Sequence, residues 1–245
     1  MTTFRPRPGL DDRVLSIDVI EHGGGEIAVL PSAGAVLGFQ YRGRVRTGEQ
    51  LLSTAGVTGI LSAARRYEYL GETASILVCF TPQGAACLGV PGSELAGHSL
   101  ALDQLIPAVR VRELTERLIE LRSARERVAL VEEFLLALPY AEDRLVARAM
   151  RLIAAGRGED AAVAQVARAL GLSERQLERR FTARVGVAPK RYAGLVRFER
   201  ASRLVLTAPS LTHAALDAGY YDQSHFIREF RRYAGVSPGR FARGR

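Results

Sequence analysis

The 245-residue sequence is poor in cysteine and in long apolar stretches, and each shortage excludes a class of protein. Its two cysteines, Cys79 and Cys87, are too few for a disulfide framework and lack the spacing of a structural zinc site. Cys79 lies inside an apolar stretch, which predicts a buried, reduced thiol. No apolar stretch approaches the length of a membrane span, and no apolar signal region is found near the first residue. We therefore expect a cytoplasmic protein that does not enter a membrane.

The N-terminal half also lacks the residue patterns of metal, phosphate or catalytic chemistry. His22 and His98 have no second metal ligand at a suitable spacing, which favours surface or core histidines. The glycine triplet at residues 23–25 is not followed by Gly-Lys-Ser or Gly-Lys-Thr, which favours a hairpin turn over a phosphate-binding loop. We predict no catalytic residues, no metal site and no cofactor, and the protein is not expected to be an enzyme.

Positive charge is present but concentrated at one end of the chain. Residues 142–245 hold 20 Arg or Lys against 10 Asp or Glu, a net charge of +10, whereas residues 1–141 hold 14 against 16, a net charge of −2. Arginine carries this charge, since Lys190 is the only lysine. Such an asymmetry indicates a nucleic-acid-binding half and a half with another task.

The basic half contains an internal repeat. Residues 163–193 and 212–242 share apolar, glycine and proline positions at an offset of 49, namely Phe181 and Phe230, Gly186 and Gly235, Pro189 and Pro238, Ala193 and Ala242. Each copy reads as a short apolar helix, a glycine, a capping residue (Ser173 or Asp222) and a second helix with a buried phenylalanine. The repeat predicts two helix–turn–helix units joined by a helix over residues 189–206.

The second helix of each unit is expected to expose a basic, polar face. Arg and Gln bind guanine and adenine edges in the major groove, and a recognition helix delivers them from its N-terminal turns. The predicted base-facing residues are Arg175, Gln176, Glu178, Arg179, Gln223, Ser224, His225, Ile227 and Arg228. The predicted phosphate contacts are Ser173, Arg180, Arg197, Arg231 and Arg232. A single basic helix face is as consistent with a solvated charged surface as with DNA binding. Two matched basic units favour binding to double-stranded DNA.

A longer motif runs through the same region. It reads A-x-x-x-G, S-x-x-x-L-x-R-x-F and G-x-x-P-x-x-Y, continues through Arg197, Ala201 and Leu204, and ends with G-Y-x-D-Q-S-H-F-x-R-x-F and G-V-S-P-x-x-F. The stretch resembles the DNA-binding domain of the AraC/XylS family of bacterial transcription regulators. This resemblance implies sequence-specific regulation of transcription, with RNA polymerase as a further partner. Tyr220, where Phe is commoner, is a departure that lies off the proposed base-reading face.

Residues 1–140 predict a small β-rich domain. Expected strands cover residues 14–20, 26–30, 35–41, 59–63 and 75–80, with turn signals between them, which favours a compact antiparallel barrel or sandwich. The two arginines and two tyrosines at Arg65, Arg66, Tyr67 and Tyr69 could line an anion pocket. A half-exposed strand with alternating aromatic residues is the favoured interpretation. Residues 30–32, 39–40 and 80–85 resemble, less specifically, the cupin-like sensor domain of some AraC-type regulators. That resemblance implies a small-molecule effector, dimerisation, or both.

Helices are expected over residues 102–121, 125–138 and 142–158. The first two either pack on their own domain or form a homodimer seam, and the third begins the C-terminal domain. The predicted fold class is α+β, with an N-terminal antiparallel β-barrel and two helices in residues 1–140. Residues 141–245 are predicted to form an all-α AraC-type domain. Two alternatives remain: an architectural DNA-binding protein, and a DNA-repair-type enzyme with AraC-like units, which would need a cysteine cluster that this chain does not supply.

Overall fold

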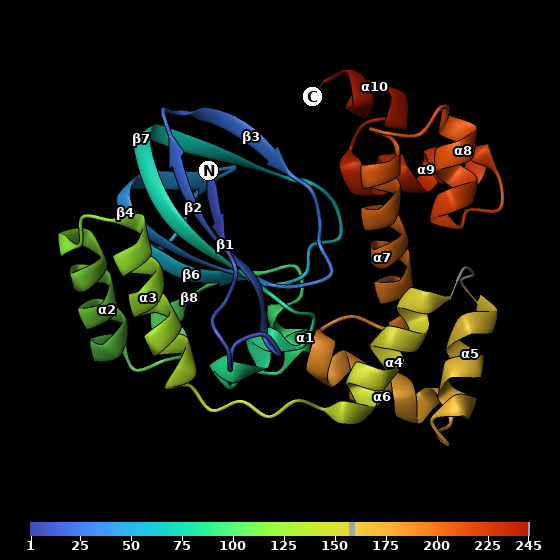
Figure 1. Ribbon diagram of the computed structural model, residues 1–245, viewed down its shortest axis with the longest axis horizontal. Helices are drawn as coiled ribbons and strands as arrows, with labels where there is room; N and C mark the ends of the chain where they lie inside the picture. Colours follow the sequence, from blue (N-terminus) through green and yellow to red (C-terminus); the bar gives the residue numbers. More distant parts are fainter. Residues whose placement is uncertain (157–159, 245) are drawn as a thin grey trace.

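The computed structural model describes residues 1–156 and 160–244, and it confirms the α+β fold class. An antiparallel sheet with helices forms the N-terminal part, and the C-terminal domain is helical (Figure 1). Within the described ranges, no helix is long and apolar enough to span a membrane. The strands are β1 Thr2–Phe4, β2 Val14–His22, β3 Gly25–Val29, β4 Val36–Thr47, β5 Gln50–Leu51, β6 Ala55–Thr58, β7 Arg65–Phe80 and β8 Ser99–Ala101.

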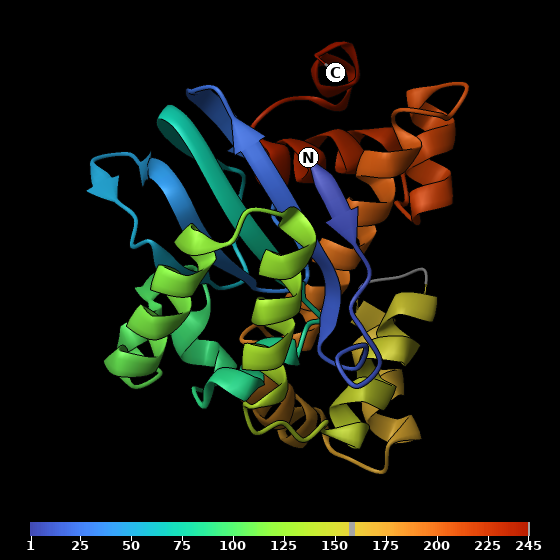
Figure 2. The ribbon, with the colours of Figure 1, turned by 60° about the vertical axis from the view of Figure 1, so that its left-hand side comes forward.

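Strand β7 is the centre of the sheet. Its C-terminal half pairs with β2 and β4, and its N-terminal half pairs with β3 and the far end of β4, all antiparallel. The hydrogen-bonded order is β1-β2-β7-β4-β6-β8, with β3 and β5 beside β7 and β4. The register of β4 against β7 shifts twice between Gln40 and Arg44. Because such bulges bend a strand, the sheet curls strongly on itself (Figures 1 and 2).

The two faces of the sheet have different surroundings. On β7, Ile76 and Val78 are fully buried, whereas the alternate residues Leu77 and Cys79 are only half-buried. Side chains alternate between the faces of a strand, so one face packs into a core with the helices α2 Ala108–Glu120 and α3 Ala124–Leu136. The other face lines a cavity. Figure 2 shows α2 and α3 at one side of the sheet and the C-terminal helices beyond the other.

Three expected elements differ from the structure. Residues 23–25 do not form the expected hairpin turn, because β2 and β3 run in the same direction along successive parts of β7. The predicted strand at residues 59–63 is wrong: β6 ends at Thr58, because Gly59 leaves no room for a Cβ against the Leu95 carbonyl and Ile60 turns into the C-terminal core. The helix predicted from residue 102 begins only at Ala108, since Pro107 precedes it and residues 102–104 form a short 3₁₀ turn. The favoured strand over residues 65–69 is confirmed as the start of β7.

The C-terminal domain contains two helix pairs, α5 with α6 and α8 with α9, arranged about the long helix α7 (Figure 1). Its helices are α4 Arg144–Ala155, α5 Asp160–Ala169, α6 Glu174–Val185, α7 Pro189–Leu204, α8 Leu211–Ala218, α9 Gln223–Ala234 and α10 Pro238–Arg243. The predicted core residues Phe181 and Phe230 are 0% exposed. Phe198 of α7 packs on Phe230 with ring centroids 5.2 Å apart. Residues 157–158, predicted to end the helix that begins the domain, lie outside the described residues.

Two loops of the N-terminal part contact the C-terminal domain. Ala33 and Ile60 are buried within the C-terminal core. The Ala33 N–H donates a hydrogen bond to Oε1 of Glu199 on α7, at 2.7 Å. The Ala64 N–H donates to the carbonyl oxygen of Tyr233 on α9, at 2.6 Å. Both hydrogen bonds tie backbone of the sheet region to the helices that carry the repeated units.

A third contact joins the short helix α1 Gly92–Leu95 to the end of α6. A Cβ on Gly92 would lie 2.6 Å from the backbone nitrogen of Gly186, so the approach requires glycine. Gly186 has a φ of 95° and ends α6 in the left-handed conformation. The two backbones therefore meet without an intervening side chain.

Candidate nucleic-acid interface

Helix α6 carries the first predicted recognition face. Gln176 N–H donates to Ser173 Oγ at 3.3 Å, and Ser173 N–H donates to Gln176 Oε1 at 2.9 Å. This reciprocal capping box fixes where the helix begins. Arg175, Glu178 and Arg179 are exposed on its outer surface. The Gln176 carboxamide oxygen is engaged in the cap, so bidentate reading of adenine by Gln176 would require it to leave the cap.

Helix α9 carries the second face and is capped by one side chain. The His225 N–H donates to Asp222 Oδ1 at 2.7 Å, which confirms the predicted cap. Gln223, Ser224 and Arg228 are exposed, as a base-reading role requires. Arg228 occupies the position equivalent to Arg179 of α6. Among the described residues, neither guanidinium has a hydrogen bond or ion pair that ties it to the protein surface.

Two predicted base-facing residues of α9 point partly inward. The His225 Nε2 lies 3.4 Å from Oε2 of Glu229, and the His225 ring meets the Tyr220 ring edge-on. Ile227 is half-buried and packs against the C-terminal core. The outward face of α9 therefore rests mainly on Gln223, Ser224 and Arg228, with His225 and Ile227 at its margin.

The structure corrects the assignment of Arg197 as a phosphate contact. Arg197 is 7% exposed and donates two hydrogen bonds to the carboxylate of Glu229, at 2.9 and 2.6 Å. Its guanidinium also lies over the Tyr220 ring, 4.8 Å from the centroid. A guanidinium in the interior needs a paired carboxylate, and Glu229 is the acid that α9 supplies. The pair holds α9 against α7 and leaves Arg197 no access to a phosphate.

Arg180 is exposed but engaged. Its Nε and a terminal nitrogen reach both oxygens of Asp143, at 2.7 and 3.1 Å. Asp143 also caps α4 by accepting hydrogen bonds from the Leu145 and Val146 N–H groups. Burial raises the pKa of Asp143, but the hydrogen bonds from Arg180 and the backbone outweigh it and hold that pKa below its ordinary value. Arg180 therefore fixes α6 on α4, and a phosphate contact would compete with Asp143.

The remaining predicted phosphate contacts lie at the surface. Arg231 and Arg232 are exposed near the end of α9, and Arg232 lies over the Tyr233 ring, 4.7 Å from its centroid. Ser173 lies at the N-terminus of α6, where unpaired backbone N–H groups favour an anion. No group of three or more His, Cys, Asp or Glu able to hold a metal ion is found among the described residues.

The N-terminal part contains a partly open cavity of about 630 Å³ that the sequence did not predict. It lies on the half-buried face of the sheet. Its lining residues are Val29, Leu30, Ser32, Gly34, Val36, Gly38, Gln40, Val45, Gln50, Leu51, Leu52, Ser53, Gly56, Thr58, Gly59, Leu61, Tyr67, Tyr69, Ser75, Leu77, Cys79, Ser99, Leu100, Ala101 and Gln104. Small residues at alternate strand positions, such as Gly38, Gly56 and Ser75, are the sequence signal that marks this face.

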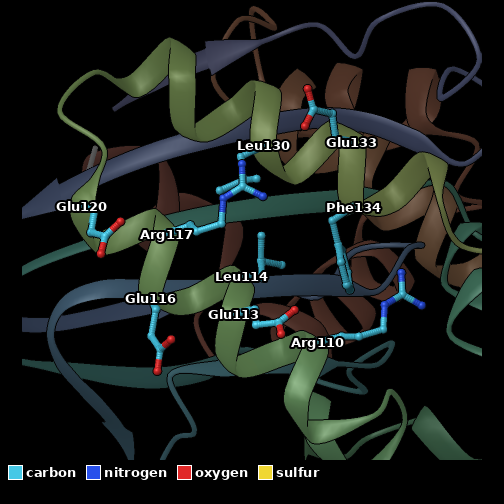
Figure 3. Close-up of a pocket in the computed structure, with 9 residues that line it drawn as sticks. All are labelled: Arg110, Glu113, Leu114, Glu116, Arg117, Glu120, Leu130, Glu133 and Phe134. Atoms are coloured by element: carbon cyan, nitrogen blue, oxygen red, sulfur yellow. The ribbon is translucent and has the colours of Figure 1, made fainter.

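A second hollow is an open groove of about 460 Å³ between α2 and α3. Its floor is apolar, formed by Leu114, Leu130 and Phe134. Its rim is charged, and Figure 3 shows the rim side chains of α2 beside this floor. The rim residues are Arg110, Glu113, Glu116, Arg117, Glu120 and Glu133.

Known proteins match the repeated region. Residues 166–244 match the model of a family described as a helix-turn-helix domain. The HTH-type transcriptional regulator MtrA of Neisseria gonorrhoeae is 34% identical over 74 residues, which are 30% of this chain and 25% of that protein. The HTH-type transcriptional activator RhaS of Escherichia fergusonii is 36% identical over 81 residues, 33% of this chain and 29% of that protein. The match therefore spans only a quarter to 29% of the length of these relatives.

These matches coincide with the paired helices, the two capped recognition helices and the motif that ends in G-V-S-P-x-x-F. The C-terminal domain is an AraC-type helix–turn–helix domain. For the whole chain, ToxT of Vibrio cholerae, solved with a bound unsaturated fatty acid, gives a TM-score of 0.52 at 11% identity. The alignment covers 94% of this chain and 95% of that one. The AraC-type domain thus follows a β-rich part in the same overall fold.

Proposed function

We propose that this protein is a sequence-specific DNA-binding regulator of transcription. The observation that carries the proposal is the pair Arg179 and Arg228, at equivalent exposed positions of two capped helices that one long helix joins. Recognition helices so arranged enter successive major grooves on one face of the duplex, about 34 Å apart. Arg231 and Arg232 would contact phosphates beside the second groove.

Selection of bound sequences from random duplex DNA, followed by titration of the selected site, tests the proposal. The wild-type chain should select a site with two short conserved blocks one helical turn apart. Replacing Arg179 or Arg228 with alanine should weaken binding to the selected site. Arg125→Ala removes the same charge from the distant helix α3 and serves as the control. Failure to enrich any sequence would refute specific recognition. Binding that depends on salt alone would instead favour the architectural alternative.

We further propose that a small molecule in the cavity of the N-terminal part modulates DNA binding. The segments that line the cavity alternate with residues that contact the AraC-type domain: Ser32 and Gly34 line the cavity, while Ala33 between them is bonded to Glu199. Leu30 does both, since it lines the cavity and packs against the C-terminal core. A ligand that fills the cavity would press on the loop that touches α7. The ToxT structure with a bound fatty acid is compatible with such a site.

The rim of the groove in Figure 3 supports a second copy of this chain as a partner. Arg110, Glu113, Arg117 and Glu120 lie on one face of α2 with alternating charge. In an antiparallel pair of α2 helices centred on Thr115, Arg110 faces Glu120 of the second copy and Glu113 faces Arg117. The helix face is therefore complementary to itself, which favours a homodimer through α2 and α3 over purely intramolecular packing.

Sedimentation at several protein concentrations tests the dimer. Arg117→Glu places an acid opposite Glu113 in both symmetry-related pairs and should weaken association up to about 30-fold, because each of the two exposed pairs contributes at most about 1 kcal/mol. Adding Glu113→Arg should restore it. Arg125→Glu changes the same charge outside the groove and should leave association unchanged. Equal association of all four proteins would refute the proposed register.

We also propose that the domain boundary falls near residues 140–141. The N-terminal core ends with Leu138 and Tyr140, and the first helix residue of the C-terminal core is Val146. Limited proteolysis of the full chain should cut between these two cores first, and a first cut inside either core would refute the boundary.

A further inference from the structure

The partly open cavity of the N-terminal part has the size of a small-molecule site. Its volume of about 630 Å³ lies within the usual range of about 300–1,000 Å³ for ligand pockets. It faces the half-buried side of β4, β6 and β7, where Val36, Gly38 and Leu77 remain partly exposed although the alternate residues are fully buried. The partial exposure of these apolar side chains is explained by the space in front of them.

The wall of the cavity is uncharged. Among the described residues that line it there is no Asp, Glu, Lys, Arg or His; they are aliphatic residues and glycines with Ser, Thr, Gln, Tyr and one Cys. Two charged side chains form hydrogen bonds with residues of the wall. Arg65 donates to Ser99 Oγ at 2.9 Å, and Cys79 Sγ donates to Asp18 Oδ2 at 3.5 Å. Neither Arg65 nor Asp18 is among the residues that line the cavity.

The polar groups of the wall offer hydrogen bonds without charge. The Gln40 carboxamide has a buried oxygen without a partner among the described residues, and its nitrogen makes only a long bond of 3.5 Å to the Ser53 carbonyl. Tyr67 and Tyr69 bring phenol groups to the same space. A buried acceptor without a donor is costly, so a ligand that donates a hydrogen bond to Gln40 would be favoured.

A charged ligand has no compensation in such a wall. A carboxylate or ammonium group loses its hydration on entry and finds no opposite charge to replace it. The penalty for an unpaired charge in an apolar site corresponds to a loss of at least about 100-fold in affinity. An uncharged alkyl chain with a hydroxyl group loses far less, because its polar end can bond to Gln40 or to a tyrosine.

We infer that the effector of the cavity is an uncharged, largely apolar molecule with at least one hydrogen-bond donor, and that acids and amines of the same size are rejected. The inference rests on the proposed function only in calling this molecule an effector. It distinguishes this chain from a regulator that takes an ionised fatty acid.

Calorimetric titration of the full-length protein at pH 7 with 1-octanol, octanoate and octylamine tests the inference, since the three probes differ mainly in charge. Octanol should bind, and octanoate and octylammonium should bind at least about 100-fold more weakly. Comparable affinity for octanol and either charged probe, or no binding of octanol, would overturn the proposal.

Two variants place a cation in the wall. Leu77→Lys, and Gln40→Lys at a position that is already polar, should each invert the preference and favour octanoate over octanol by about tenfold or more. Leu70→Lys lies on the same strand, is exposed and does not line the cavity, so it should keep the wild-type preference. Unchanged preference in every folded wall variant would show that the probes bind elsewhere and would refute the site.

Titration of each preparation with its selected DNA site separates this inference from the proposed function. A protein that selects octanol but binds no specific DNA would refute the regulator while leaving the cavity assignment intact. A protein that binds its DNA site but does not discriminate among the probes would refute the cavity assignment alone.

Discussion

The two helix–turn–helix units share one scaffold but hold their recognition helices in different ways. At equivalent positions, α6 has Arg180 and α9 has Glu229. Arg180 reaches outward to Asp143 at the start of α4, in a pair whose arginine side chain is 53% exposed. Glu229 points inward to Arg197 of α7, in a pair that is 8% and 4% exposed. The comparison shows that a repeated backbone can be secured either by surface or by buried electrostatics.

The difference also changes what each helix can offer to DNA. In α6, the capping box engages Gln176, and an outward arginine is engaged by Asp143. In α9, the equivalent of Gln176 is His225, whose Nε2 lies 3.4 Å from the Glu229 carboxylate. Along α6 and α9, Arg179 and Arg228 are the exposed residues that are identical at equivalent positions. We therefore expect the two units to read different bases around one common arginine contact.

Breaking the buried pair should have the largest effect. Arg197→Ala leaves the Glu229 carboxylate in the interior without its main partner and should lower the free energy of unfolding by about 3–5 kcal/mol. Arg180→Ala removes the equivalent surface pair and should lower it much less, because water replaces the lost contact. Urea unfolding of the two variants measures the contrast. Similar losses would mean that burial does not distinguish the two units.

Removing the shared arginine contact should affect recognition rather than stability. Arg179→Ala and Arg228→Ala should each cost about 1–3 kcal/mol in binding to the selected DNA site and relax its preference at one or two base pairs. The two variants should relax different blocks of the site, since each helix reads its own groove. Anisotropy titrations on specific and random duplexes decide this. An equal loss on both duplexes would assign the arginine to phosphate contact.

The caps allow a smaller test of the same comparison. Ser173→Ala and Asp222→Ala should each lower the free energy of unfolding by about 1 kcal/mol, because each leaves backbone N–H groups of a helix N-terminus unpaired. Ser173→Ala keeps the backbone N–H that donates to Gln176 Oε1, so Gln176 stays engaged and neither variant should alter the base preference of its unit. Urea unfolding measures both losses, and an unchanged free energy of unfolding in either variant would contradict the role of that cap.

The contact of α7 with the cavity loop should give the smallest effect, visible only as pH dependence. Burial raises the pKa of Glu199 above its ordinary value, although the Ala33 N–H and Arg203 oppose it. The folded state therefore holds this proton more tightly, and the stability that it contributes is present below pH 4.5 and lost as pH rises through the raised pKa. Glu199→Gln lacks this loss. The free energy of unfolding of wild type should therefore fall relative to that of Glu199→Gln as the pH rises above 4.5, as measured by urea unfolding at several pH values. A difference between the two proteins that does not change with pH would refute the assignment.

Much of the C-terminal domain was predictable from local patterns. Gly171 and Gly219 end the first helices, Ser173 and Asp222 cap the second ones, and Phe181 and Phe230 occupy the buried face, all of which depend on neighbours within a few residues. The role of Arg197 was not predictable in this way. Its partner lies 32 residues further along the chain, and an arginine on a helix looks the same in sequence whether it meets water or a carboxylate.

The sheet region shows the same limit more strongly. The strands expected at residues 14–20 and 75–80 lie within β2 and β7, because turns and apolar runs mark them in the sequence. The segment at 59–63 has the composition of a strand, yet Gly59 and Ile60 leave the sheet to meet α1 and the C-terminal core. Only the packing of distant segments decides between these uses of an apolar run.

By itself, the amino-acid sequence determined the two helix–turn–helix units, the basic charge of residues 142–245 and the arginines at equivalent outward positions. Helix spacing, caps and charge are local properties that act within a turn or two of the chain. The tertiary structure alone decided that Arg197 is buried against Glu229, that Arg180 is paired with Asp143, and that the sheet curls around a cavity with an uncharged wall. These features arise where segments far apart in sequence exclude water together, and no local pattern specifies which segments those are.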